Sequence, residues 1–164
     1  MSSHERLSAL LRQSVEDFAW AVAQVPTARH ALASPRHPED WPTDRHIFHL
    51  LVYERHVALP SMRQWSDGAP ALGEQDIPDE DALWADSATD RAVDALLAGL
   101  RTVRAEQLAL LDRIPLGAWD EPRPALWGMV TLRWVLTKTY QHTCEHTHDV
   151  LRMALWWGDG PTAL

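Results

Sequence analysis

The sequence predicts an all-α fold, a four-helix bundle with a long crossover between its second and third helices. Four stretches carry apolar residues at three- and four-residue steps, and no stretch has the alternation typical of strands. Residues 66–86 separate the second stretch from the third. At 164 residues the chain fits one domain, residues 1–164.

The first predicted helix covers residues 4–33, and Pro26 is expected to kink it or to end its regular part, because proline lacks the backbone N–H. The second predicted helix follows a Trp-Pro pair. Thr43 is its expected N-cap, and the helix continues to about residue 65. Pro60 is expected to bend or terminate this helix.

Residues 66–86 hold glycines, prolines and many acidic residues without a sustained period, which indicates a long connection. Such a connection can cross the bundle, so the second and third helices can run parallel. The third helix is predicted to begin near Ser87 or Thr89 and to end before Pro115. After a second irregular stretch, the fourth helix is predicted over residues 131–157.

Charge and composition exclude several classes of protein. The net charge of −8, without a basic stripe, argues against a nucleic-acid partner. Residues 1–13 lack the apolar core of a signal peptide, and no later run reaches membrane-spanning length, so we expect a cytoplasmic protein without a membrane partner. Cys144 is the single cysteine, which excludes an internal disulfide; we expect a packed thiol rather than a nucleophile.

The nine histidines include a pair with the spacing of metal ligands. His142 and His146 lie four residues apart, and so on one face of the fourth helix. The apolar stripe of that helix passes through both, so the pair is expected to face the bundle interior. Two imidazoles are too few for a metal site, and His49, in an apolar part of the second helix, is the natural third ligand.

A structural interpretation of these histidines stands beside the metal interpretation. A single inward histidine is more often a core residue bonded to a carbonyl, and a His-x-x-x-His spacing arises readily by chance among nine histidines. His46, one turn before His49, is a candidate supporting residue or substitute ligand. His4, His30, His37 and His56 are expected to be solvated or structural, and His148 is expected to be turned away from the inward face of its helix.

The sequence resembles the DinB/YfiT-like superfamily of metal-binding four-helix bundles over nearly its whole length. Two features and the chain length carry the resemblance: a Trp-Pro pair that leads into the second helix, and a Thr-Leu-Arg-Trp-Val-Leu run that opens the fourth. The residues concerned are Trp41, Pro42, Phe48, His49, Leu50 and Glu54 in the first feature, and residues 131–136, His142 and His146 in the second.

The resemblance implies a bundle with parallel middle helices and a divalent metal, zinc or nickel with iron as an option, at His49, His142 and His146. It also implies an enzyme that activates a low-molecular-weight thiol or water for a small-molecule substrate, as a thiol S-transferase or a hydrolase. A homodimer is a further implication. The metal would have open coordination positions, as a catalytic site requires.

Three further residues are candidates for supporting roles. Tyr53, one turn after His49, is a candidate catalytic group that could hydrogen-bond the metal-bound species, or else a core aromatic residue. Glu54 and Glu145 could orient a ligand imidazole, although a surface position is the commoner role of a carboxylate. The alternative function is a non-catalytic, stress-associated metal-binding bundle, which a closed site with four protein ligands would indicate.

Overall fold

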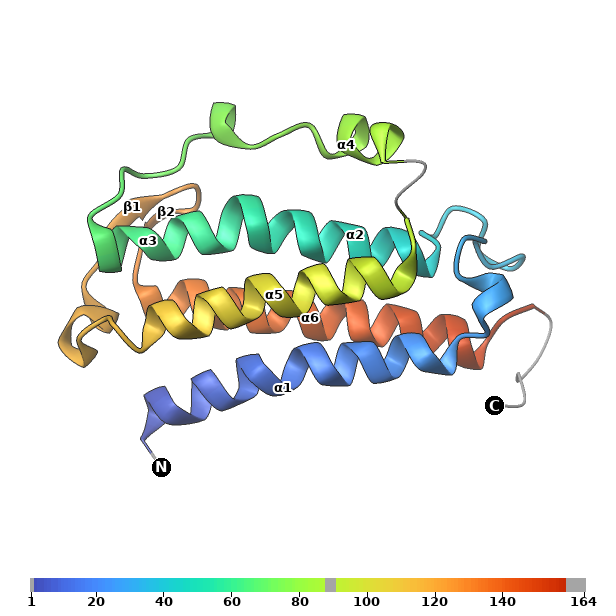
Figure 1. Ribbon diagram of the computed structural model, residues 1–164, viewed down its shortest axis with the longest axis horizontal. Coiled ribbons are helices and arrows are strands. Elements are labelled where there is room, and N and C mark those ends of the chain that lie inside the picture. Colours follow the sequence, from blue (N-terminus) through green and yellow to red (C-terminus); the bar gives the residue numbers. More distant parts are fainter. Residues whose placement is uncertain (1, 88–90, 159–164) are drawn as a thin grey trace.

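The computed structural model describes residues 2–87 and 91–158, in which four long helices lie side by side (Figure 1). Three of them are α1 (Ser3–Gln24), α5 (Val93–Leu111) and α6 (Leu132–Leu155). The fourth, here called the α2–α3 helix, joins α2 (Thr43–Tyr53) and α3 (Leu59–Asp67) through the π-helical turn η2 (Glu54–Ala58). The predicted four-helix bundle is confirmed.

One apolar core runs along the inside of the bundle, where α1 and α2 each pack against both α5 and α6. Each helix presents one apolar stripe to this core, and a fully buried side chain of this kind stabilises the fold by roughly 1.5–3 kcal/mol. The largest of these fully buried side chains include Leu11, Phe18, Ile47, Leu50, Met62, Leu100, Leu132 and Leu136.

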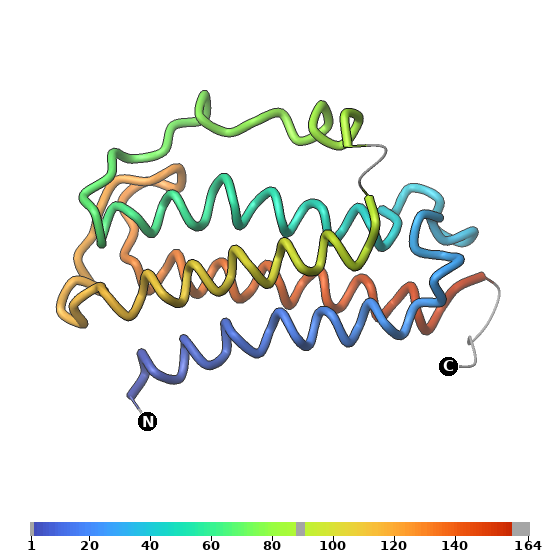
Figure 2. Tube along the Cα trace, viewed as in Figure 1, coloured from blue at the N-terminus to red at the C-terminus, as the bar shows by residue number. Residues whose placement is uncertain are grey.

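The α2–α3 helix and α5 run in the same direction, because contacts between them advance together along both helices. Asp44 shares a surface hollow with residues 91–94, and Leu51 lies against Gly99, where a Cβ atom would come within 3.1 Å of the leucine. Residues 68–87 run back along the outside of the α2–α3 helix (Figures 1 and 2). This path brings the connection over the part of α2 that carries the histidines.

The π-helical turn explains how the helix passes Pro60. Proline has no backbone N–H to bond the carbonyl four residues earlier, and its ring crowds that carbonyl. The chain widens there instead, and the N–H of Leu59 bonds the carbonyl of Glu54 five residues back. The helix therefore continues to Asp67 and stops at Gly68, whose φ of 66° suits glycine. The predicted termination at Pro60 is wrong.

Several short elements lie where the sequence predicted irregular chain. The connection contains the 3-10 turn η3 (Glu74–Asp76) and α4 (Glu80–Asp86), a helix too short to display a period. The side chain of Asp79 caps α4 by accepting from two backbone N–H groups. A hairpin of β1 (Arg123–Ala125) and β2 (Gly128–Val130) also corrects the prediction of a chain without strands.

Helix boundaries differ from the predictions mainly at prolines and caps. The helix α1 ends at Gln24, and the 3-10 turn η1 (Thr27–Arg29) follows Pro26. Pro42 is the N-cap of α2, and Thr43 is its first helical residue. The helix α5 begins at Val93; Ser87 is instead the C-cap of α4, and Thr89 lies outside the described residues. The 3-10 turn η4 (Leu116–Asp120) precedes the hairpin.

Helix length and apolarity also bear on membrane insertion. Among residues 2–87 and 91–158, no helix combines the length and apolarity needed to cross a bilayer.

Candidate metal centre

Three imidazoles meet between α2 and α6. The Nε2 atoms of His49 and His142 lie 3.0 Å apart, and those of His142 and His146 lie 3.2 Å apart. One nitrogen from each of the three rings lies within 4.8 Å of the others. The two α6 histidines occupy successive turns of one face, as their spacing predicted, while α2 brings His49 to the same level.

The distances between these nitrogens fit a divalent metal. Zinc bonds imidazole nitrogen at about 2.0–2.1 Å, so two ligand nitrogens stand about 3.0 Å apart at a right angle and about 3.4 Å apart at the tetrahedral angle. The two measured separations, 3.0 and 3.2 Å, lie within that range. Three nitrogen donors at this spacing could therefore hold one metal ion, and would leave coordination positions for other ligands.

The proton on His49 faces away from the cluster. Its Nδ1 atom lies 2.7 Å from the carboxylate of Glu80, which therefore accepts from Nδ1–H and leaves the lone pair on Nε2 for the cluster. Glu80 begins α4 and also pairs with Arg45 at 3.0 Å. Burial alone would raise the pKa of Glu80, but its interactions with His49, followed by the charge of Arg45, outweigh burial and lower the pKa.

Two imidazoles of the cluster, those of His142 and His146, are neutral at neutral pH. Burial, together with the neighbouring histidines, lowers the pKa of His142 and of His146 to about 3. Burial likewise lowers the pKa of His46 to about 4, and its Nδ1 atom lies 2.8 Å from Nδ1 of His146. Neutral imidazole is the form that binds metals, so these rings need lose no proton at neutral pH.

Two aromatic side chains pack around the cluster. The Trp41 ring lies parallel to the His146 ring, with the two ring centroids 6.3 Å apart. The centroid of the Trp41 ring also lies 5.0 Å from that of the His49 ring. Tyr53 packs edge-on against His142 at 4.4 Å. Burial raises the pKa of Tyr53 to about 12, so its phenol stays protonated, and its oxygen is buried without a hydrogen bond of good geometry to the described residues.

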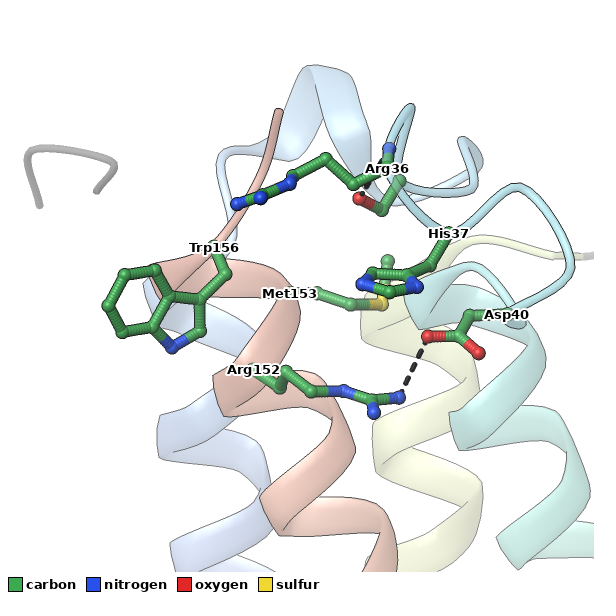
Figure 3. A pocket seen from close by; sticks show the side chains of 7 residues that line it. Arg36, His37, Asp40, Arg152, Met153 and Trp156 are labelled. Atoms are coloured by element: carbon green, nitrogen blue, oxygen red, sulfur yellow. Dashed lines mark hydrogen bonds and ion pairs between the residues drawn. The ribbon is translucent and has the colours of Figure 1, made fainter. Parts of the chain in front are cut away.

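Surface hollows reach the cluster from the α6 side. His142 and His146 line an open hollow of about 840 Å³, and His46 and His146 line a second of about 290 Å³. A further hollow of about 270 Å³ shares Asp40 and Arg152 with the second, and Figure 3 shows Arg152 reaching Asp40, with which it pairs at 2.7 Å. His142 and His146 thus border the surface of the molecule on this side.

The family of the chain follows from a match that spans most of its length. The DinB superfamily matches residues 3–150. The chain belongs to the DinB superfamily. The structure is similar to that of YfiT from Bacillus subtilis, described as a probable metal-dependent hydrolase with an unusual four-helix bundle topology.

The similarity to YfiT supports the fold assignment. The TM-score is 0.73 at 17% sequence identity, and the match covers 96% of this chain and 91% of YfiT. At this identity the likeness establishes the shared fold of two DinB-like bundles. No curated protein matches the chain.

Predicted and observed carboxylate partners differ in this DinB-superfamily bundle. Glu54 is fully buried and pairs with Arg104 in the core, and Glu145 accepts from Gln141 on the surface, so neither orients a cluster imidazole. Glu80 takes that role for His49. The sequence offered no sign of it, because α4 lies in a connection without a period.

The remaining predictions concern residues of α6 and the other histidines. Cys144 is exposed, so the expected packed thiol is wrong: its position on α6 faces solvent. The side chain of His148 is 79% exposed and lies outside the cluster, as expected. His30 bonds the carbonyl of Val25, which is a structural role.

Removing the Glu80 carboxylate is expected to weaken metal binding without removing a ligand. Without this carboxylate, His49 loses the acceptor that fixes its Nδ1–H tautomer, and the loss of such partners typically costs 10- to 100-fold in metal affinity. We expect a zinc dissociation constant higher by that factor in Glu80→Ala, measured by competition with a chromophoric chelator. The exposed Glu74→Ala, in the same connection, is the control; equal affinities in both variants would contradict the role of Glu80.

The metal-free protein is expected to lose stability as the pH falls below 6.5. The pKa values of His46, His142 and His146 are lowered to about 3–4 in the fold, so below 6.5 the unfolded chain binds more protons than the folded chain. Stability is therefore fully present above pH 6.5 and declines toward pH 4, by up to about 1.4 kcal/mol per pH unit for each ring. Urea unfolding between pH 7.5 and 5 measures the slope, which should be shallower in His142→Asn.

Proposed function

We propose that this protein is a metal-dependent enzyme of the hydrolase type, which activates a water molecule at a divalent metal held by His49, His142 and His146. The observation that carries the proposal is the convergence of three Nε2 atoms at metal-ligand spacing beside hollows open to the surface. Three protein ligands with open positions are characteristic of catalytic zinc, whereas structural zinc has four.

The surroundings of the cluster support an enzyme over a closed structural site. Among the described residues, the nitrogens of three rings form this donor group, and no fourth side chain joins it. The similarity to YfiT, whose description names a probable metal-dependent hydrolase, adds support at the level of the family. A bundle whose metal only stabilises the fold, one form of the non-catalytic alternative that the sequence left open, would have no need of the access that the hollows provide.

Each neighbouring side chain has a defined part in this proposal. A divalent metal at the three nitrogens would make a bound water more acidic and would polarise a substrate carbonyl. Glu80 holds His49 in the tautomer that offers Nε2 to the centre, and Trp41 packs against two ligand rings. Tyr53 is protonated and packs against His142, and its phenol would donate to an oxygen bound at the centre.

The narrower family expectations remain predictions. These are activation of a low-molecular-weight thiol for S-transfer, zinc or nickel as the metal with iron as an option, a cytoplasmic location and a homodimer. The described donor set does not distinguish the metals, because imidazole suits zinc, nickel and iron alike. A thiol would bind at the same open positions as water, so one experiment can separate the two reactions.

The test combines reconstitution with a substrate panel. The purified protein is stripped with chelator, reloaded with zinc, nickel or iron, and assayed against small esters and amides with and without a low-molecular-weight thiol. We expect metal-dependent hydrolysis that falls at least about 100-fold in His142→Ala and persists in the surface variant His148→Ala. If turnover requires the thiol, the reaction is S-transfer and not hydrolysis, which would overturn the hydrolase assignment. Absence of metal binding in the wild type would refute the whole proposal.

A further inference from the structure

His46 contacts the centre without belonging to the group of three converging nitrogens. It lies one helical turn before His49 on α2 and is 6% exposed. Its Nδ1 atom is 2.8 Å from Nδ1 of His146, with ring centroids 5.0 Å apart and planes inclined by 62°. A separation of 2.8 Å between two nitrogens is that of a hydrogen bond, so one proton lies between them.

The direction of this hydrogen bond follows from the other nitrogen of His146. That atom, Nε2, lies 3.2 Å from Nε2 of His142, on the side where the three rings converge. If Nε2 offers its lone pair there, a neutral His146 carries its proton on Nδ1. The Nδ1 atom of His46 is then the acceptor, and the proton of His46 is on its own Nε2.

We propose that His46 is a positioning residue, which accepts the Nδ1–H of His146 and so fixes the tautomer and orientation of that ring. The inference rests on the proposed metal centre. His46 acts on His146 as Glu80 acts on His49, so two of the three cluster rings have a partner on Nδ1. The third ring, His142, has an Nδ1 atom that is buried without a hydrogen-bond partner among the described residues.

Two other roles for His46 are less compatible with the geometry. As a fourth ligand of the same ion it would have to reach past the His146 ring, because its near nitrogen faces Nδ1 and not Nε2 of that ring. His46, His146 and Asp149 could also hold a second ion, since their donor atoms lie within 4.8 Å of one another. An ion bound through Nδ1 of His146 would need a lone pair on that atom, where the proposed hydrogen bond places a proton.

Two substitutions separate a hydrogen-bond acceptor from a space-filling ring. His46→Phe keeps a ring but offers no acceptor, and we expect its zinc affinity to fall 10- to 100-fold. His46→Asn keeps an acceptor, because its side-chain oxygen can take the place of Nδ1, and we expect most of the affinity to return. His148→Phe, on the exposed face of α6, should bind zinc as the wild type does. Chelator competition gives all four constants.

Nitrogen NMR of the wild-type rings provides a readout that needs no variant to fold. Long-range ¹H–¹⁵N spectra of the zinc-loaded protein should show His146 protonated on Nδ1 and His46 protonated on Nε2. Unchanged affinity in His46→Phe, a metal-bound shift on a His46 nitrogen, or two zinc ions per chain would each overturn the inference. If the wild type binds no zinc, the proposed function fails, while spectra of the metal-free protein still test the hydrogen bond.

Discussion

Replacing His146 with alanine is expected to abolish stoichiometric metal binding. His146 supplies one of three converging nitrogens, and two imidazoles on different helices hold a metal ion far less tightly than three. The dissociation constant for zinc should rise by more than about 100-fold, beyond the 10- to 100-fold range typical of losing a supporting partner. Calorimetric titration of chelator-treated protein measures the change, and plasma mass spectrometry measures the metal retained on purification.

The neighbouring helix turn offers a matched control for this experiment. His148 lies two residues further along α6, and its side chain is 79% exposed. His148→Ala removes an identical side chain from the same helix and should leave metal content unchanged. Equal metal content in the two variants would mean that the nitrogens which converge in the structure do not hold the metal.

Replacing Arg104 with methionine is expected to destabilise the bundle by about 3–5 kcal/mol, because it leaves a buried carboxylate without its cation. Arg104 is 2% exposed, and its guanidinium pairs with both carboxylate oxygens of the fully buried Glu54. It also bonds the hydroxyls of Ser14 at 2.9 Å and Thr143 at 3.1 Å. The Arg104 side chain, on α5, thus forms hydrogen bonds with α1, α6 and the π-helical turn. Urea unfolding at neutral pH measures the loss.

Two comparisons show whether the burial of Glu54 is the cause. The double variant Glu54→Leu with Arg104→Met removes both charges and should recover most of the lost stability, since an apolar pair of similar volume is often tolerated. Arg101→Met, three residues earlier on α5, breaks an exposed pair with Glu16 of α1 and should cost at most about 1 kcal/mol. A loss for Arg104→Met as small as that for Arg101→Met would refute this account.

The main elements of fold and site were accessible from the sequence because they depend on periodicity. The α6 histidines share a face with Val135, Thr139 and Val150, all of which are buried. Their three- and four-residue spacing is sufficient to place both imidazoles on the inward side of the helix. The neighbours of His49 are too apolar for a surface turn, which indicates an inward position, and His49 does lie beside the pair.

Residues that act through tertiary contacts were not accessible in this way. Glu80 follows a stretch without any period, and only the return path of the connection brings it to His49. Arg104 lies in an amphipathic helix, where its sequence position does not distinguish a buried guanidinium from one that reaches solvent along an apolar stem. Both expectations for Glu54, an imidazole partner or a surface carboxylate, are wrong, because nothing local shows that its partner lies fifty residues away on α5.

The position of Glu80 on the connection has a thermodynamic consequence for residues 68–87. The hydrogen bond between Glu80 and His49 contributes to two equilibria, the docking of α4 on the bundle and the binding of a cation by the imidazoles. Because the two equilibria are linked, a ligand that shifts docking toward the docked state binds that state more tightly than the undocked one. The ratio of the two affinities equals the factor by which the ligand shifts the docking equilibrium. A metal at the centre would thus stabilise the docked position of the connection over α2, and undocking of the connection would lower the affinity for the metal.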